Sequence, residues 1–252
     1  MVQQFDSKDR YSDIKPYKYN KIQINNGKDY INASPINIIK EKYFISTQGP
    51  KDNTVEDFWT MIDEQNCSII VMLCNLQEGG WEKCAKYWHK SMKKYTIKQE
   101  KKKKEEKEEK EKNEFYKIRN LVLINNETKK ERNVVQIHFK GWPDHGIPEI
   151  EDGEVFKAFI EMNKLVDENK KEGPIVVHCS AGVGRTGTFI SMYYLEKEIR
   201  SQINDPKVKN IKINVFNLVR KLKEMRLYLV QSVSQYYFIY EFVNYLLNSL
   251  NK

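Results

Sequence analysis

The 252-residue chain has only four cysteines and no long apolar run. None of the cysteine spacings is CxxC, and the histidines form no HxH or HExxH pattern, so we predict no metal site. No segment approaches the roughly 18 consecutive apolar residues that a membrane-spanning helix needs. The first residues, MVQQFDSKDR, lack the apolar stretch of a secretory signal. We therefore expect a cytoplasmic domain with reduced thiols, or the cytoplasmic part of a longer chain.

The net charge of +8 leaves several kinds of partner open. Basic surfaces attract nucleic acid and membranes, but also acidic and phosphorylated substrates. Much of the charge lies in one run, residues 98–112, which reads KQEKKKKEEKEEKEK and mixes both signs. Such a run cannot pack a core, so we expect a solvated surface insert. Because no aromatic platform or nucleic-acid-binding motif accompanies it, we predict no nucleic-acid partner.

Apolar periodicity predicts one α/β (α+β) domain over residues 1–252, with a central twisted mixed sheet flanked by helices. Residues 68–73 and 175–177 form short apolar runs, and alternation at period two predicts paired strands at 115–124 and 133–139. Helical spacing predicts helices at 53–65, 151–170, about 186–200, 211–225 and 232–249. No internal repeat or linker divides the chain.

The informative feature is a seven-residue turn between the strand at 175–177 and the next helix. It reads Cys179-Ser180-Ala181-Gly182-Val183-Gly184-Arg185. The N–H groups of such a turn can form an anion nest, to which the helix adds the positive end of its dipole. Arg185 can bind two phosphate oxygens, and the same field favours a nucleophilic thiolate at Cys179. The turn therefore predicts phosphoryl transfer to sulfur. A nucleotide-binding loop would instead end in Gly-Lys-Ser/Thr.

The segment 177–187, VHCSAGVGRTG, resembles the His-Cys-x5-Arg-Ser/Thr signature of the cysteine-dependent protein tyrosine phosphatases. The resemblance covers roughly residues 5–250 and implies hydrolysis of phosphotyrosine in proteins through a phosphocysteine on Cys179, without a cofactor. Arg185 and the turn residues Ser180, Ala181, Gly182, Val183 and Gly184 would hold the phosphate. His178 would help to hold the thiolate, and Thr186 would support release of phosphate from sulfur.

Trp142-Pro143-Asp144, followed by His145-Gly146, resembles the mobile acid loop of that family. The chemistry needs such a loop, because a tyrosine leaving group requires a proton that neither Cys179 nor Arg185 can supply. Asp144 would be the general acid in the first step and the general base in the second.

The segment Lys8-Asp9-Arg10-Tyr11 resembles the family's Lys-Asn-Arg-Tyr loop, with Asp9 in place of the usual Asn. The resemblance implies that Tyr11 stacks on the substrate ring and that Asp13 accepts backbone N–H bonds from the substrate peptide. Residues 29–34 and 47–50 resemble further family segments with an architectural role.

Glu78 and Lys83 resemble the family pair that braces the catalytic Arg and the acid loop. Gln231 and Gln235, in VQSVSQY, resemble the family glutamines, and Gln231 would position the attacking water. Arg226 would support that segment.

Two other activities stay open. A dual-specificity phosphatase would share Cys179, Arg185 and an acid, but not the Tyr11 loop, the segment at 29–34 or the two glutamines. A catalytically dead phosphotyrosine-binding module would be expected to lack the Cys, the Arg or the acid-loop Asp, and all three are present. We expect a monomeric domain whose partners are phosphotyrosine-containing proteins, with no membrane segment in the chain.

Overall fold

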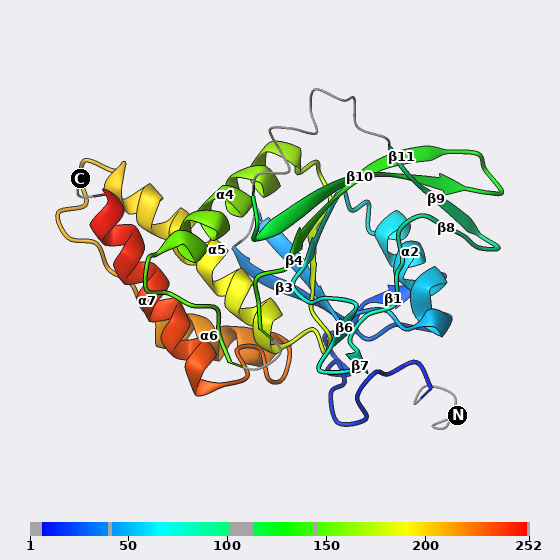
Figure 1. The fold of residues 1–252 in the computed structure, drawn as a ribbon, viewed down its shortest axis with the longest axis horizontal. Coiled ribbons are helices and arrows are strands. Elements are labelled where there is room, and N and C mark those ends of the chain that lie inside the picture. Colours follow the sequence, from blue (N-terminus) through cyan, green and yellow to red (C-terminus); the bar gives the residue numbers. More distant parts are fainter. Residues whose placement is uncertain (1–6, 40–41, 101–112, 144–145, 251–252) are drawn as a thin grey trace.

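A twisted eight-stranded mixed sheet forms the centre of the computed structural model, which describes residues 7–39, 42–100, 113–143 and 146–250 (Figure 1). Its strands run in the order β3 (Ala33–Ile39), β4 (Lys42–Thr47), β12 (Ile175–His178), β5 (Ile69–Met72), β11 (Glu131–Phe139), β10 (Tyr116–Asn125), β9 (Tyr95–Gln99) and β8 (Lys90–Ser91). Two short hairpins lie outside it: β1 (Gln23–Ile24) with β2 (Asp29–Tyr30), and β6 (Gln77–Glu78) with β7 (Trp81–Glu82). Asp144 and residues 101–112 of the predicted insert lie outside the described residues.

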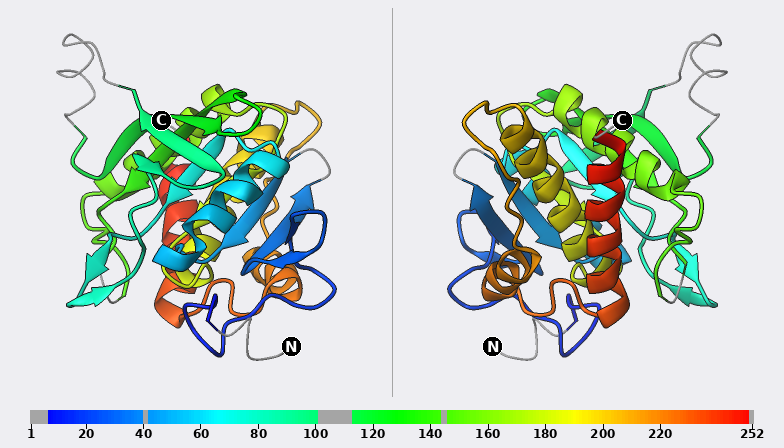
Figure 2. Two further views of the ribbon diagram at one scale, coloured as in Figure 1. Left: turned by 90° about the vertical axis from the view of Figure 1, so that its right-hand side faces the viewer. Right: turned by 90° about the vertical axis from the view of Figure 1, so that its left-hand side faces the viewer.

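Helices cover both faces of this sheet. α4 (Glu154–Asn169), α5 (Gly184–Ile203), α6 (Val215–Met225) and α7 (Val233–Leu250) lie on one face, and α2 (Val55–Glu64), preceded by the 3-10 turn η1 (Asp52–Thr54), lies on the other (Figures 1 and 2). The predicted α/β fold is confirmed. None of the helices in the described ranges combines the length and hydrophobicity that crossing a bilayer requires.

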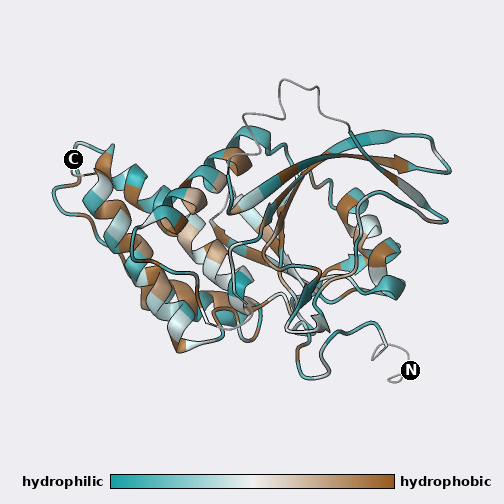
Figure 3. Ribbon diagram, in the orientation of Figure 1, coloured by the Kyte–Doolittle hydropathy of each residue, from teal (hydrophilic) through white to brown (hydrophobic). Residues whose placement is uncertain are grey.

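The middle of the sheet is parallel and fully buried. β12 pairs in parallel with both β4 and β5, and β5 pairs in parallel with β11, whereas the outer strands pair antiparallel. All four residues of β12 are buried, which fits an apolar strand covered on both faces. Figure 3 shows the same trend, with hydrophobic residues along the central strands. The parallel strands β4, β5 and β12 therefore end at one edge of the sheet, where the predicted turn begins.

Several boundaries differ from the sequence prediction, and α6, for example, begins at Val215 and not near residue 211. β9 extends through Gln99, so Lys98 and Gln99 pair with Val122 and Leu121 and do not belong to a solvated insert. α5 begins at Gly184, since the glycine-rich turn leads directly into the helix. α4 ends at Asn169, before the Gly173-Pro174 stop.

Candidate active site

We call residues 179–185, between β12 and α5, the phosphate loop. Cys179 lies at the end of the central strand and is only 5% exposed. The N–H group of Gly182 donates to the Cys179 Sγ at 3.3 Å. Gly182 has a φ of +70°, and a Cβ atom there would lie 2.1 Å from the carbonyl oxygen of Thr47. Only glycine fits this position, because the loop is folded closely against the end of β4.

Glu78 fixes the guanidinium of Arg185. The two side chains form a bidentate pair, with Nη1–Oε1 and Nη2–Oε2 distances of 2.7 and 2.8 Å. Burial alone would lower the pKa of Arg185, but the hydrogen bond to Glu78 and the nearby Cys179 outweigh it and raise the pKa. Arg185 also donates to the carbonyl oxygen of Pro143 at 3.0 Å. This contact brings the residue before Asp144 to the phosphate loop.

A cavity of about 430 Å³ opens above the phosphate loop. It brings together most of the predicted substrate-binding and catalytic residues: Tyr11, Asp13, Lys83, Ser180, Ala181, Gly184, Arg185, Gln231, Gln235 and Cys179. Ile14, Glu78, Gly146, Ser232 and Ser234 also line it. Four predicted site residues are buried and do not line the cavity: Gly182 and Val183 within the loop, and His178 and Thr186 beside it. The buried Thr186 hydroxyl has no hydrogen-bond partner within the described part of the chain.

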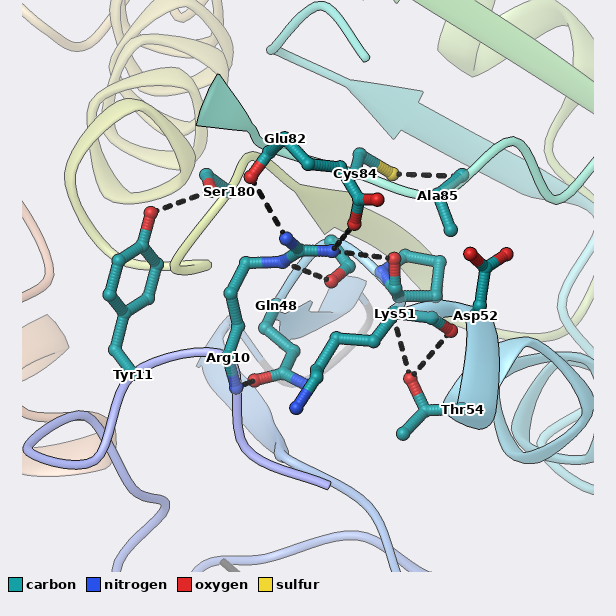
Figure 4. Close-up of polar contacts among 12 residues, drawn as sticks. Arg10, Tyr11, Gln48, Lys51, Asp52, Thr54, Glu82, Cys84, Ala85 and Ser180 are labelled. Carbon is teal, nitrogen blue, oxygen red and sulfur yellow. Dashed lines mark hydrogen bonds and ion pairs between the residues drawn. The ribbon is translucent and has the colours of Figure 1, made fainter. Parts of the chain in front are cut away.

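Hydrogen bonds hold the Tyr11 segment against the phosphate loop (Figure 4). The hydroxyls of Tyr11 and Ser180 lie 2.9 Å apart. Arg10 donates to the carbonyl oxygens of Gly49, Pro50 and Glu82, at 3.1, 2.9 and 3.0 Å. One wall of the cavity is therefore attached to several separate parts of the chain.

A fully buried arginine, Arg226, supports the phosphate loop from below. It donates to the carbonyl oxygens of Gly182 and Ala181, at 3.0 and 3.2 Å, and to Asn32 Oδ1 at 2.6 Å. Asn32 in turn donates to Asp9 Oδ1 at 2.8 Å. Burial lowers the pKa of Arg226 to about 10, although Tyr30, Cys179 and Asp9 oppose this shift. Because the loop carbonyls bond to Arg226, they point away from the cavity.

A second buried hydrogen-bond chain runs across the sheet, from Arg119 in β10 and Gln136 in β11 to His178 in β12, and reaches the Cys179 backbone. The Nε2 of His178 lies 2.8 Å from the Tyr87 hydroxyl, and its Nδ1 lies 3.1 Å from the Cys179 carbonyl oxygen. Gln136 donates to the Tyr87 hydroxyl at 2.6 Å and accepts from Arg119 at 2.7 Å. The Cys179 carbonyl oxygen can only accept, so the neutral His178 ring carries its proton on Nδ1 and accepts from the Tyr87 hydroxyl at Nε2.

The same arginine also contacts His138 and Trp88. Arg119 lies 3.2 Å from His138 Nδ1 and stacks over the Trp88 ring at 4.2 Å, and His138 Nε2 contacts the Cys74 carbonyl oxygen at 2.9 Å. Burial lowers the pKa of His138 to about 3 and that of His178 to about 4. We call Arg119, Gln136, Tyr87 and His178 the Arg119 chain. Sequence analysis identified only His178 of these four residues.

The segment 230–236, which contains Gln231 and Gln235, packs directly on the first turn of α5. A Cβ atom at Gly184 would lie 3.2 Å from Gln231 Oε1 and 2.8 Å from Gln235 Nε2, and one at Gly187 would lie 2.4 Å from the backbone nitrogen of Val230. The Val230 N–H donates to the Val183 carbonyl oxygen at 3.3 Å. The two backbones are therefore in contact, with no side chain between them.

The four cysteines are free and buried. Within the described ranges, no group of three or more His, Cys, Asp or Glu side chains is arranged to hold a metal ion.

Comparisons with known proteins agree with this geometry. The protein-tyrosine phosphatase family model matches residues 5–245. The rat (Rattus norvegicus) tyrosine-protein phosphatase non-receptor type 20 is 37% identical over 246 residues, which cover 96% of this chain and 55% of that protein. The human (Homo sapiens) receptor-type tyrosine-protein phosphatase C is 39% identical over 251 residues, which cover 93% of this chain and 18% of that protein. The chain thus spans about half the length of the type 20 relative. It belongs to the protein-tyrosine phosphatase family.

Proposed function

We propose that this chain hydrolyses phosphotyrosine in proteins through a covalent phosphocysteine on Cys179. The observation that carries the proposal is the phosphate loop. It combines a cysteine sulfur facing the Gly182 N–H with an Arg185 guanidinium fixed by Glu78, at the base of one cavity.

In the first step, the Cys179 thiolate attacks phosphorus and the bond from phosphorus to the tyrosine oxygen breaks. The loop N–H groups and Arg185 stabilise the equatorial oxygens in the transition state. Asp144 gives its proton to the departing tyrosine oxygen. The contact between Arg185 and the carbonyl oxygen of Pro143 supports this role, because it holds Pro143, the residue before Asp144, beside the phosphate loop.

In the second step, water attacks phosphorus, the bond from sulfur to phosphorus breaks, and phosphate leaves. Asp144 accepts a proton from the water, and Gln231, which lines the cavity, orients it. The unpaired Thr186 hydroxyl, buried at the start of α5, is available to stabilise the departing sulfur.

Substrate selection follows from the depth of the cavity. Tyr11 forms a wall that suits an aromatic ring, and its bond to Ser180 holds the ring upright beside the loop. A phosphoserine side chain is shorter, so its phosphate would not reach Cys179. Asp13, at the rim, would accept backbone N–H bonds from the peptide. The free, buried thiols suit a reducing, cytoplasmic compartment.

The test compares turnover of p-nitrophenyl phosphate, a phosphotyrosine peptide and a phosphoserine peptide. The first two should be hydrolysed and the third should not. Cys179→Ser should abolish turnover and preserve the fold, since a serine hydroxyl does not ionise near neutral pH. Equal turnover of phosphoserine would indicate a dual-specificity phosphatase. Binding of the phosphotyrosine peptide without turnover would indicate a binding module.

Asp144→Ala tests the acid. It should lower kcat by roughly 10²–10⁴ for the phosphotyrosine peptide. The loss should shrink for a leaving group that needs no proton. An equal loss with both leaving groups would exclude Asp144 as the general acid.

A further inference from the structure

Trp81 is the exposed member of the four tryptophans. Trp59, Trp88 and Trp142 are buried, at 0%, 6% and 2% exposure, whereas Trp81 is 75% exposed. It lies in β7, directly after the Gly79-Gly80 turn of the β6–β7 hairpin. Tryptophan is a large apolar side chain that contributes strongly to binding when it is covered. An uncovered tryptophan in this place suggests a binding contact.

The register of the hairpin places Trp81 on the side of the cavity. Trp81 pairs directly with Glu78, and residues opposite each other in an antiparallel pair point to the same face. Glu78 uses that face to hold Arg185, and Lys83, two residues after Trp81, lines the same cavity.

The opposite face of the hairpin is held by Arg10. Glu82 Oε1 lies 3.1 Å from Arg10 Nη2, and the Glu82 carbonyl oxygen accepts a second bond from Arg10. The hairpin is therefore held from both sides, through Glu78 and through Glu82. Trp81 therefore extends from a supported strand, on the same face of the hairpin as the cavity residues Glu78 and Lys83, without lining the cavity itself.

We propose that Trp81 forms an apolar subsite for a substrate side chain that flanks the phosphotyrosine. This inference rests on the proposed function, because it extends the same site. An extended peptide advances about 3.3 Å per residue, so the first few neighbours of a bound phosphotyrosine cross the rim. The rim residues Asp13, Lys83, Gln231 and Ser232 are polar or charged. Trp81 therefore selects a neighbouring apolar side chain, such as leucine, over serine.

Fluorescence gives a readout that does not depend on turnover. Because the other three tryptophans are buried, Trp81 should supply most of the acrylamide-quenchable emission. Cys179→Ser protein is titrated with phosphotyrosine peptides that carry leucine or serine at the flanking positions. We expect the leucine peptide to shift the emission to the blue and to reduce quenching, and the serine peptide to do neither. The unphosphorylated leucine peptide is the control for non-specific contact.

Kinetics provide the second readout. Trp81→Ala should lower kcat/KM roughly tenfold for the leucine peptide, the loss typical of a covered aromatic contact. It should leave the serine peptide and p-nitrophenyl phosphate within about twofold. Trp81→Phe should retain most of the preference. Phe216→Ala removes another exposed aromatic, on α6 and 63% exposed, and should change none of the three rates.

Two results would overturn the inference. An equal loss on all three substrates would show that Trp81 acts through Arg185 or the acid loop, and an unchanged leucine preference would show that it makes no contact. If the wild-type protein hydrolyses no phosphotyrosine peptide, the proposed reaction fails, and the fluorescence titration still decides whether Trp81 contacts the peptide.

Discussion

Two buried arginines support the surroundings of Cys179, and they do so in different ways. Arg226 lies below the phosphate loop, is fully buried, and donates to loop carbonyls. Arg119 lies in the sheet, on β10, is 9% exposed, and donates to the neutral side chains of Gln136 and His138. The first determines the direction of the loop carbonyls. The second begins the chain of hydrogen bonds that ends at His178.

This difference separates two requirements of the site. A phosphate cradle needs its N–H groups turned inward, which a buried cation achieves by holding the carbonyls on the other side. The proposed role of Cys179 as nucleophile would need an oriented neutral imidazole, which a chain of polar side chains achieves without bringing a charge to His178. Removing Arg226 should therefore cost more than interrupting the Arg119 chain.

The largest effect is expected for Arg226→Lys. Lysine keeps the charge but cannot reach the Gly182, Ala181 and Asn32 oxygens together, so buried acceptors lose their donors. We expect a loss of about 3 kcal/mol or more in the free energy of unfolding and at least a roughly tenfold fall in kcat. Urea unfolding and turnover of p-nitrophenyl phosphate measure the two losses.

The matched control for that prediction is Arg200→Lys. Arg200 pairs with Glu196 one turn earlier in α5, and its side chain is 39% exposed. Its replacement should change the stability by no more than about 0.5 kcal/mol. Equal stability of the Arg226→Lys and wild-type proteins would refute the role given to Arg226.

A smaller effect is expected for Tyr87→Phe, which interrupts the Arg119 chain. The change removes the hydroxyl between Gln136 and His178 and leaves two buried polar groups without that partner. We expect a loss of about 1–3 kcal/mol in the free energy of unfolding and less than a tenfold fall in kcat. Tyr116→Phe, which removes an exposed bond to Glu161, is the control. A larger fall in kcat than that of Arg226→Lys would reverse the comparison.

The pH dependence of stability tests whether His178 in the Arg119 chain, and His138 beside it, are neutral in the folded protein. Burial lowers the folded-state pKa of His178 to about 4 and of His138 to about 3, below the unfolded value of about 6.5. As the pH falls below about 6.5, the unfolded chain takes up these protons first, so the folded state loses stability down to about pH 4 for His178 and about pH 3 for His138. Each histidine should contribute a slope approaching about 1.4 kcal/mol per pH unit.

Urea unfolding between pH 7 and pH 5 measures this slope. His138→Gln should reduce it, because the glutamine amide can still accept from Arg119 and does not titrate. His89→Gln, the same substitution at an exposed histidine, is the control. A stability that stays constant between pH 7 and pH 5 would contradict the neutral, buried state of both histidines.

The smallest effect is expected for Asp9→Asn. Asp9 Oδ1 accepts from Asn32 and Tyr30, and an asparagine oxygen can keep both bonds. The change removes a negative charge that is linked to Arg226 through Asn32 and that also pairs with the Lys15 ammonium group at 3.8 Å. We expect a loss of about 1 kcal/mol or less in urea unfolding, the usual value of a single net interaction. Asp52→Asn, at a side chain 79% exposed, is the control, and a gain in stability would show that Arg226 does not need this carboxylate.

The sequence predicted the parts of the site that are contiguous in the chain. Strand, turn and helix follow one another from Ile175 to Ile203, so the glycines and the apolar run were enough to locate the phosphate loop. The strands β10 and β11 were predicted by their alternation. Alternation gives the face of each residue but not its partner, so it could not show that Arg119 lies opposite Gln136.

Trp81 was missed for a related reason. In the sequence, an isolated tryptophan beside two glycines has no periodicity, and only the paired hairpin reveals which way it faces. The strand residues Lys98 and Gln99 were assigned to the charged run because their composition matches it. Their pairing with β10 depends on Leu121 and Val122, more than twenty positions away in the sequence.

Gly187 has a consequence for how the site can vary. A side chain there would collide with the main chain of Leu229 and Val230, the residues that lead into Gln231. The separation between the start of α5, which follows the phosphate loop, and the segment that leads into Gln231 is thus set by contact between two backbones. Side-chain rotamers cannot tune it, and substitutions elsewhere in the core can alter it only by moving a whole helix. If Gln231 orients water as proposed, its backbone is therefore held at one spacing from the start of α5.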